Sequence, residues 1–424
     1  MTEWSLSVYC LAWSAHGGIS AAEFSTQEYR LLHAAAALLR SPFTDTLVNA
    51  EMKAMTVASP TIGAIGRLAV KAWLAAALTV ALMLALAAAP AAAAPADTSR
   101  LHCSVHILPV RLTDPGPADQ TMWGQLCFVG PRPPTTVQLL VHGAFLNHTY
   151  WDSPIHHGFY SYVRHATAAG YATFAVDRIG YGNSSHPDSS QLTMFNAAVS
   201  LHDAITALRD GAVGGFAFSK VMWVGHSFGS AIGWVEIARY HDVDAALLTG
   251  QFVNARAPEV DPIVGADIYP AVDDPKFANS GLDLGYLTTK PGTRESLFFD
   301  PKTVEPEIVA ADEAGKDTLP GAEFTSFLSI DALPVDQAPT NQITVPVLLM
   351  AGANDFFSCF GTLPYNCADP ASVLRFEAQF FTHAQLRVVI IPRTGHCLAL
   401  STTAPRTDAV MLQWSRSVLP PRGK

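Results

Sequence analysis

VMWVGHSFG, residues 221–229, joins an apolar, strand-like run to a stretch with the character of a helix, residues 230–240. It contains the pattern Gly-x-Ser-x-Gly at the junction. A serine at such a strand-to-helix turn stands clear of its neighbours, and the first amides of the helix point toward it. Gly225 and Gly229 leave room for a turn that strains the backbone at the central residue. The stretch therefore predicts that Ser227 is a nucleophile.

The composition predicts a large folded core and no nucleic-acid partner. The chain has 424 residues, of which 49% are hydrophobic and 15% charged, with a net charge of -10. This apolar content is enough to bury a core. There is no Lys/Arg-rich run to neutralise phosphates. A mildly acidic enzyme fits these numbers, and we expect it to be a monomer.

Short apolar runs alternate with helical patterns along the chain after residue 97. Strands that are apolar throughout and separated by helices predict an α/β fold, with a mostly parallel central sheet of about eight strands flanked by helices. The expected strands are 103–110, 124–129, 137–141, 172–176, 221–224, 245–248, 347–350 and 387–391, and the expected helices are 159–169, 194–209, 230–240, 371–383 and 407–418.

A long interval without strand signal separates the sixth and seventh expected strands. We expect residues of about 252–342 to form a lid inserted into the domain, because a loop this long in a compact domain is usually functional. It contains six phenylalanines, and four of them bear on the question of the substrate. They favour a hydrophobic substrate group, or they pack the lid against the body: Phe298, Phe299, Phe324 and Phe327.

A nucleophilic serine needs a base and an orienting carboxylate. His396 is the only one of the 15 histidines that follows the last expected strand, and Asp355 follows the strand before it. Asp177 is a rival acid, but it precedes Ser227 in the chain, and we expect it to form a structural ion pair with Arg178 instead. The order serine, acid, histidine predicts the triad Ser227, Asp355 and His396.

A serine nucleophile also needs backbone N–H donors for the oxyanion that forms when it attacks. His142 and Gly143 close the strand that precedes the first expected helix, so that the next amide turns toward the site. The second donor is the amide that follows the nucleophile. We therefore expect the amides of Ala144 and Phe228 to form the oxyanion hole, with His226 as a supporting residue.

These motifs together resemble the α/β-hydrolase superfamily over roughly residues 103–420. The matching segments are His142-Gly143, the run 177–182 (DRIGYG), the serine elbow, the acid turn 352–355 and Gly395-His396. The resemblance implies carboxylic ester hydrolysis through an acyl-enzyme, on a small-molecule or lipid-like ester and without a cofactor. The Cys103 hairpin and the segment 150–152 (YWD) look like secreted hydrolases of actinobacteria and fungi.

Other functions share this fold and stay open. A peptidase or amidase would need acidic residues to hold a substrate amine, and an acyltransferase or a haloperoxidase without cofactor would use the same triad. We expect the acidic lid residues to form a solvated stretch instead: Glu295, Glu305, Glu307, Asp312 and Glu313. A noncatalytic binding protein on this fold would lack a triad member, and none is missing. No metal site is expected, since there is no H-E-x-x-H or Cys/His ligand set.

The N-terminal third carries an apolar segment. Residues 67–96 combine two basic residues, a Leu-rich run and then small residues and prolines, which predicts a secretory signal peptide. The alternative is an uncleaved anchor over residues 72–94, which would place the protein on a membrane. Residues 1–66 would be an extension, or translation would begin at Met52 or Met55. A hydrolase domain would occupy 97–424.

Export would also explain the cysteines. In an oxidising compartment the most economical pairing joins Cys103 to Cys127 and Cys359 to Cys367. Local spacing is the warrant, because four cysteines allow three connectivities. Cys397 would then stay a buried free thiol.

Overall fold

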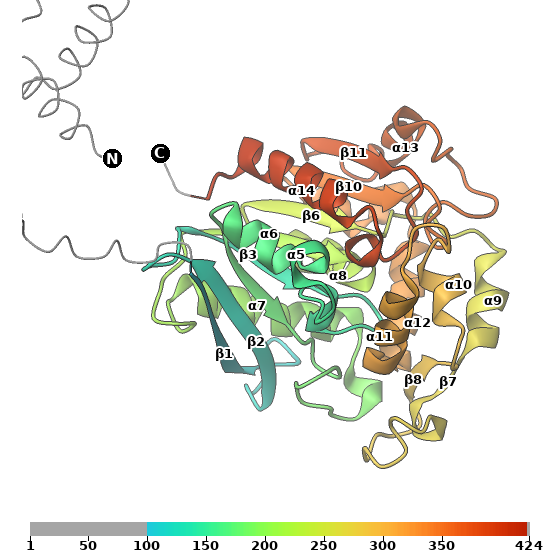
Figure 1. Ribbon diagram of the computed structural model, residues 1–424, viewed down its shortest axis with the longest axis horizontal. Helices are drawn as coiled ribbons and strands as arrows, with labels where there is room; N and C mark the ends of the chain where they lie inside the picture. The colour runs from blue at the N-terminus through green and yellow to red at the C-terminus, as the bar shows by residue number, and fades with distance from the viewer. Residues whose placement is uncertain (1–99, 422–424) are drawn as a thin grey trace, which may run out of the picture. The chain divides into compact units, whose positions relative to one another are not determined.

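The computed structural model describes residues 100–421 and contains one eight-stranded sheet at its centre (Figure 1). The strand order is β1-β2-β4-β3-β5-β6-β10-β11, with β1 and β2 antiparallel to their neighbours and all other pairs parallel. The α/β class and the eight predicted strands are thus confirmed. The strands are β1 (Leu101–Val110), β2 (Gln120–Val129), β3 (Thr136–Val141), β4 (Ala172–Val176), β5 (Lys220–His226), β6 (Ala245–Thr249), β10 (Val347–Gly352) and β11 (Leu386–Ile391).

Helices cover both faces of this sheet. Successive side chains of β5 point to opposite faces, and they meet different helices. The sulfur of Met222 accepts a hydrogen bond from Ser415, while Trp223 donates to the carbonyl of Gly229. One face therefore packs against α5 (His157–Tyr160), α6 (Tyr162–Ala168) and α14 (Ala404–Val418), and the other packs against α7 (Met194–Arg209) and α8 (Phe228–Tyr240); α13 (Pro370–Glu377) packs against β11.

Two of the predicted helices are shorter than expected. The helix expected at 159–169 is interrupted at Ser161, whose hydroxyl caps α6 by accepting the amide of Arg164 at 3.0 Å. The helix expected at 371–383 ends at Glu377.

Short 3-10 helices lie in the loops between the main elements. They are η1 (His148–Tyr150), η2 (Ser189–Gln191), η3 (Ala271–Asp273), η4 (Val335–Gln337), η5 (Pro339–Gln342) and η6 (Leu398–Leu400).

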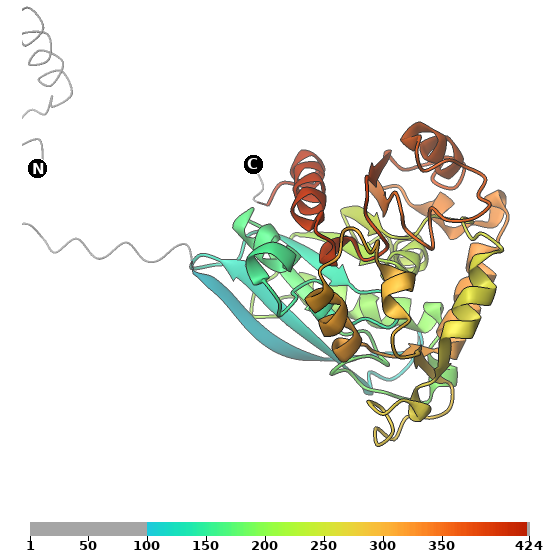
Figure 2. The ribbon, with the colours of Figure 1, turned by 45° about the vertical axis from the view of Figure 1, so that its right-hand side comes forward.

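An insertion between β6 and β10, the sixth and seventh strands of the sheet, forms the lid (Figure 2). It was expected to lack strands, and this was wrong: three short segments pair into a small antiparallel sheet of their own. The segments are too short to show an alternating pattern in the sequence. The lid contains α9 (Val260–Asp267), β7 (Ile268–Pro270), β8 (Tyr286–Thr289), α10 (Arg294–Phe298), α11 (Pro306–Gly315), β9 (Leu319–Pro320) and α12 (Gly321–Asp331).

The acidic residues of the lid are not uniformly solvated. Asp312 is buried and pairs with the buried guanidinium of Arg294 at 2.6 and 2.8 Å. Glu295 and Glu307 are exposed, as expected. The expectation fails at Asp312 because α11 places this side chain against α10, which the linear sequence does not indicate.

Two disulfides join the cysteines that were expected to pair. Cys103 lies directly opposite Cys127 in the β1–β2 ladder, and Cys359 is bonded to Cys367 in the loop after β10. Cys397 is buried and unbonded. Within residues 100–421 no helix is long and apolar enough to cross a membrane, and the apolar run at 67–96 lies outside the described residues.

Candidate active site

The predicted site residues lie on loops that leave the carboxyl ends of four parallel strands. His142 and Gly143 follow β3, Ser227 follows β5, Asp355 follows β10 and His396 follows β11. In an open α/β sheet the carboxyl ends of the strands are where ligands bind. The topology therefore gathers residues that are up to 254 positions apart in the sequence at one edge of the sheet.

Ser227 adopts the strained turn that the sequence predicted, with φ 53° and ψ -119°. This φ is unfavourable for a residue with a side chain. The flanking glycines make it possible, since a Cβ on Gly225 would lie 2.5 Å from the carbonyl oxygen of Gly229. A Cβ on Gly229 would lie 2.2 Å from the carbonyl oxygen of Val141. The amide of Ser227 donates to the carbonyl of Thr249 at 2.7 Å, which ties the turn to β6.

The imidazole of His396 is paired with the carboxylate of Asp355. Nδ1 lies 3.0 and 3.1 Å from the two carboxylate oxygens, and both side chains are buried. The carboxylate also accepts the amides of Phe357 at 2.9 Å and Ser358 at 3.2 Å. Because an ionised carboxylate only accepts hydrogen bonds, Nδ1 carries the proton of this contact, and in the neutral tautomer with this proton Nε2 holds a lone pair. That is the tautomer a general base needs.

The amides of Ala144 and Phe228 are free to bind an oxyanion. Within the described part of the chain neither amide donates to a protein acceptor, and both residues line the same cavity as Ser227. The next amide, that of Phe145, is already used by the carbonyl of Thr318 at 3.0 Å. Gly143 approaches the nucleophile so closely that a Cβ there would lie 2.8 Å from the Cβ of Ser227.

His142 is buried and holds the candidate oxyanion loop, residues 142–144, in place. Its Nε2 accepts the amide of Arg178 at 3.1 Å, so its Nδ1 donates to the carbonyl of Gly143 at 2.8 Å. Burial, together with the nearby charge of Arg178, lowers the pKa of His142 to about 3. The ring therefore stays neutral at ordinary pH and keeps both hydrogen bonds.

His226 lies between the turn of Ser227, the candidate nucleophile, and His396, the candidate base. Its ring centre lies 4.7 Å from that of His396, and it stacks on Tyr150 at 4.2 Å. Burial lowers the pKa of His226 well below its usual range, so the ring adds no charge beside His396. The hydroxyl of Ser227 and Nε2 of His396 make no hydrogen bond within residues 100–421, so the bond between them is not formed in this structure.

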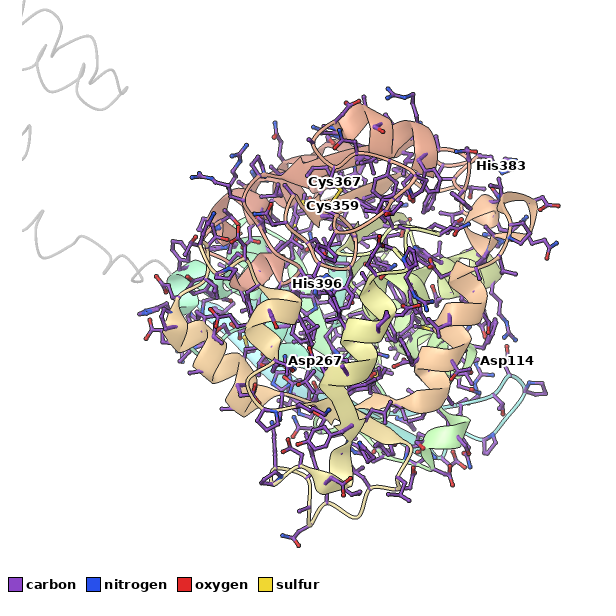
Figure 3. The ribbon with its side chains drawn as sticks, turned by 90° about the vertical axis from the view of Figure 1, so that its right-hand side faces the viewer. Asp114, Asp267, Cys359, Cys367, His383 and His396 are labelled. Carbon is purple, nitrogen blue, oxygen red and sulfur yellow. A yellow bond between two sulfur atoms is a disulfide. The ribbon has the colours of Figure 1, made fainter. Side chains whose placement is uncertain are left out.

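A small cavity of about 60 Å³ opens beside Ser227. Phe298, Phe324 and Phe327 of the lid line it, whereas Phe299 does not and instead packs its backbone against Gly395. Seen from the lid side, His396 lies in the middle of the view with the Cys359–Cys367 disulfide above it (Figure 3). The lid thus forms the apolar wall of the candidate site.

Asp177 has a structural role, but not the one expected. It accepts hydrogen bonds from the amide and ring of His148 at 2.8 and 2.7 Å, and from the amide and side chain of Asn183 at 2.9 and 3.0 Å. The expected ion pair with Arg178 is wrong, because the Arg178 guanidinium pairs with Glu323 of α12 instead. Neighbouring residues on an extended chain point in opposite directions, so Asp177 and Arg178 meet different partners.

Several residues around the site were not predicted. Tyr150 supports His226, Phe357 lies 4.5 Å from the His396 ring, and the amide of Cys397 donates to the carbonyl of Phe298 at 2.8 Å. In the sequence, the only indication of these residues was that they lie a few positions from one of the motifs. These contacts depend on how the lid and the loops pack, so no local pattern could identify them.

Solved structures resemble this fold at low sequence identity. A carboxyl esterase from Bacillus coagulans aligns with a TM-score of 0.52 and 13% identity, covering 74% of this chain and 98% of its own. A thermophilic esterase from Thermogutta terrifontis aligns with a TM-score of 0.50 and 18% identity, covering 74% and 99%. An esterase from Exiguobacterium antarcticum aligns with a TM-score of 0.50 and 15% identity, covering 73% and 98%. At these identities the likeness concerns the fold alone.

Sequence comparison identifies the family. No curated protein matches the chain. The family model described as the alpha/beta hydrolase family matches residues 138–408, which is more than half of the chain and includes every residue of the candidate triad and oxyanion hole. The chain therefore belongs to the alpha/beta hydrolase family.

Proposed function

We propose that this protein is a serine hydrolase that cleaves carboxylic esters through an acyl-enzyme. His396 Nε2 removes the proton of Ser227, whose Oγ attacks the ester carbonyl carbon. The amides of Ala144 and Phe228 stabilise the oxyanion, and His396 returns its proton to the departing alcohol. Water, deprotonated by His396, then attacks the acyl-enzyme and releases the acid. Asp355 stabilises the imidazolium formed in each half-reaction.

The observation that carries this proposal is the buried pair of His396 and Asp355 close to Ser227, a partly exposed serine with a strained backbone. A neutral histidine with Nδ1 held at 3.0 Å from a carboxylate has Nε2 ready to accept a proton. Ser227 has no partner for its hydroxyl among the described residues, so rotation of its side chain toward Nε2 breaks no hydrogen bond. Catalytic hydrogen bonds of this kind often tighten only when substrate is bound.

The cavity favours an uncharged, apolar ester. Among its described lining residues only Arg256 and Asp261 are charged, and they form an ion pair with each other. No unpaired carboxylate of the cavity is left to hold the amine of a peptide substrate. Burying an aliphatic or aromatic acyl group against the aromatic wall would instead make binding more favourable. An ester is therefore better supported than a peptide.

The test combines an active-site probe with substrate profiling. We expect a fluorophosphonate to label the purified protein once, and p-nitrophenyl esters to be hydrolysed faster than aryl amides or lactones. Ser227→Ala and His396→Ala should lose turnover by about 10³-fold or more and retain the fold, while Asp355→Asn keeps weak activity.

An exposed serine supplies the matched control. Ser190→Ala should label and turn over like the wild type, because Ser190 lies at the surface in η2. Equal labelling of wild type and Ser227→Ala, or no labelling of either, would refute the serine mechanism. Near-full activity in Asp355→Asn would refute the acid assignment alone.

We also infer that the protein acts outside the cytoplasm. Two disulfides support this, because disulfides persist mainly in oxidising compartments. The residues 67–96 would direct export, either as a cleaved signal or as an anchor. Determining the N-terminus of the protein recovered from culture medium tests this. Recovery only from the cytoplasm, with reduced cysteines, would contradict it.

A further inference from the structure

A cluster of three metal-ligating side chains lies away from the candidate active site, between α7 and the end of α8. His202 comes from α7, Glu236 from the last turns of α8, and Asp242 from the segment directly after this helix. One donor atom from each lies within 4.8 Å of the donors of the other two. His202 Nδ1 is 2.6 Å from an oxygen of Asp242 and 3.9 Å from an oxygen of Glu236.

Glu236 is 0% exposed, and no N–H or hydroxyl of the described residues donates to either of its carboxylate oxygens. The group that faces it is the carboxylate of Asp242. One oxygen of Asp242 is likewise buried and unpartnered. A buried carboxylate without hydrogen bonds or a counter-charge is costly, and natural proteins avoid it. Either a proton shared between Glu236 and Asp242 or a bound cation would satisfy these oxygens.

The neighbouring cation does not neutralise this cluster. The guanidinium of Arg209 donates to the backbone carbonyl of Asp242 and to the carboxylate of Asp244, not to the carboxylates of the cluster. The negative end of the α8 dipole points at the same place, which adds attraction for a positive charge. A cation at this position would offset the charge of the two carboxylates and satisfy their unpartnered oxygens.

We propose that His202, Glu236 and Asp242 bind a divalent transition metal ion, for which Zn²⁺ is the best match. A histidine nitrogen with two carboxylate oxygens is a ligand set that Zn²⁺ accepts, whereas Ca²⁺ and Mg²⁺ prefer oxygen ligands throughout. The side chains of His202 and Asp242 are 23% and 16% exposed, so an ion can enter and keep a water ligand.

The present distances need only small changes to fit the ion. Ligands around a tetrahedral Zn²⁺ lie roughly 3.3 Å apart when the bonds are about 2.0 Å long. The separation of 2.6 Å between His202 and Asp242 would widen, and that of 3.9 Å between His202 and Glu236 would narrow. Nδ1 of His202 would lose its proton to coordinate. Its ring, stacked on Tyr240 at 3.7 Å, is already held in the direction of the site.

The bound ion would fasten α7 to the far end of the nucleophile helix. Ser227 caps the start of α8, and Glu236 lies nine positions further on, about 13 Å along the helix axis. At this distance the ion would not touch the reacting atoms. We therefore assign it a structural role, so that stability rather than turnover reports its binding.

The experiment uses the purified full chain, freed of metal by a chelator and titrated with Zn²⁺ in a calorimeter. We expect one tight equivalent and a rise of roughly 2–4 °C in the melting temperature. Glu236→Gln and Asp242→Asn should each weaken binding at least tenfold and abolish the thermal shift. Co²⁺ should give visible absorption bands typical of a low-coordinate site in the wild type and not in these variants.

A second cluster supplies the matched control. His156, Glu305 and Glu307 also lie close together, but His156 and Glu307 are exposed. Glu307→Gln should bind Zn²⁺ like the wild type. The proposal is overturned if the wild type shows no tight equivalent, or if binding survives Asp242→Asn, or if it is lost in Glu307→Gln. A proton shared by Glu236 and Asp242 would produce the first of these outcomes. If Glu236→Gln does not fold, the partly exposed Asp242→Asn still decides the question.

Discussion

At the scale of the residue, the serine elbow depends on two positions without a side chain. Ser227 occupies a positive φ that glycine would adopt easily and serine adopts at a cost. The surrounding contacts impose this conformation, since Gly225 and Gly229 lie in direct contact with backbone atoms of neighbouring segments. The strain places the hydroxyl at the rim of the cavity, and the flanking glycines make that placement possible.

The glycine requirement gives a direct prediction. We expect Gly229→Ala to lower the free energy of unfolding by roughly 1–3 kcal/mol or more and to abolish ester turnover, because its Cβ would lie 2.2 Å from the carbonyl oxygen of Val141. Urea unfolding and p-nitrophenyl ester assays measure both effects. Gly158→Ala is the control, since a Cβ there meets nothing within 4 Å. Equal stability of the two variants would contradict the argument.

At the scale of the element, helix α12 of the lid is anchored to the oxyanion loop by buried charge. Glu323 of α12 pairs with Arg178 and accepts a hydrogen bond from Tyr181. The same guanidinium donates to the carbonyls of His142 at 3.2 Å and Gly143 at 3.3 Å. One lid carboxylate thus helps to position the loop that carries the proposed oxyanion donor.

Removing this carboxylate should affect both stability and catalysis. Glu323→Ala would leave Arg178 buried and unpaired, and we expect a loss of about 3–5 kcal/mol in the free energy of unfolding and a fall in kcat. Denaturant titration and steady-state kinetics measure the two. Glu323→Gln keeps one acceptor oxygen for Arg178, and its amide group can donate to the hydroxyl oxygen of Tyr181, so this variant should lose less. A wild-type unfolding midpoint in Glu323→Ala would show that the pair contributes nothing.

At the scale of the whole molecule, buried acids join the lid to the body at the point where the lid begins. Asp331, at the end of α12, accepts the amide of Asn254 at 2.8 Å, and Glu377 of α13 accepts the amide of Val253 at 3.2 Å. Burial raises the pKa of Asp331 to about 6, against the opposing effect of the Asn254 amide. Burial also raises the pKa of Glu377 well above its usual range.

This junction predicts a pH dependence of stability. A carboxyl pKa that is raised on folding favours the protonated folded state, so the stability it supports is complete below the unfolded pKa near 4 and is lost as the pH rises through about 6. Asp331→Asn should escape this loss. The difference in free energy of unfolding, variant minus wild type, should therefore rise by roughly 2–3 kcal/mol from pH 4 to pH 7. Denaturation across this range tests it. Parallel pH profiles would refute it.

The two disulfides act on different parts of the molecule. Cys359–Cys367 closes the loop that begins at Asp355, whose carbonyl accepts the amide of Cys359 at 2.8 Å, while Cys103–Cys127 joins strands at the edge of the sheet. We expect the double serine variant of either pair to lose roughly 2–4 kcal/mol of stability. Only the 359/367 variant should also lose activity at temperatures where both remain folded. Equal kinetics in both variants would contradict this.

Local patterns predicted the sheet and the candidate triad because their determinants are local. A buried parallel strand is apolar along its whole length, and the elbow needs its two glycines within five residues, so both are visible in a short window of sequence. Strand-end placement was then enough to select Asp355 and His396. The pairing of Asp355 with His396, 41 positions apart, follows because neighbouring parallel strands end at the same edge.

Tertiary structure alone decided what the charged and lid residues do. The sequence placed Asp177 beside Arg178 and suggested a pair, but Glu323, 145 positions away, pairs with Arg178. The small lid sheet, the burial of Asp312 and the cluster of His202 with Glu236 likewise depend on segments that meet only after folding. The physical reason is the same in each case. Hydrophobic periodicity is a local property of the sequence and can be identified in a short window. The partner of a buried charge is set by the tertiary fold, which can bring together opposite charges that are far apart in the sequence.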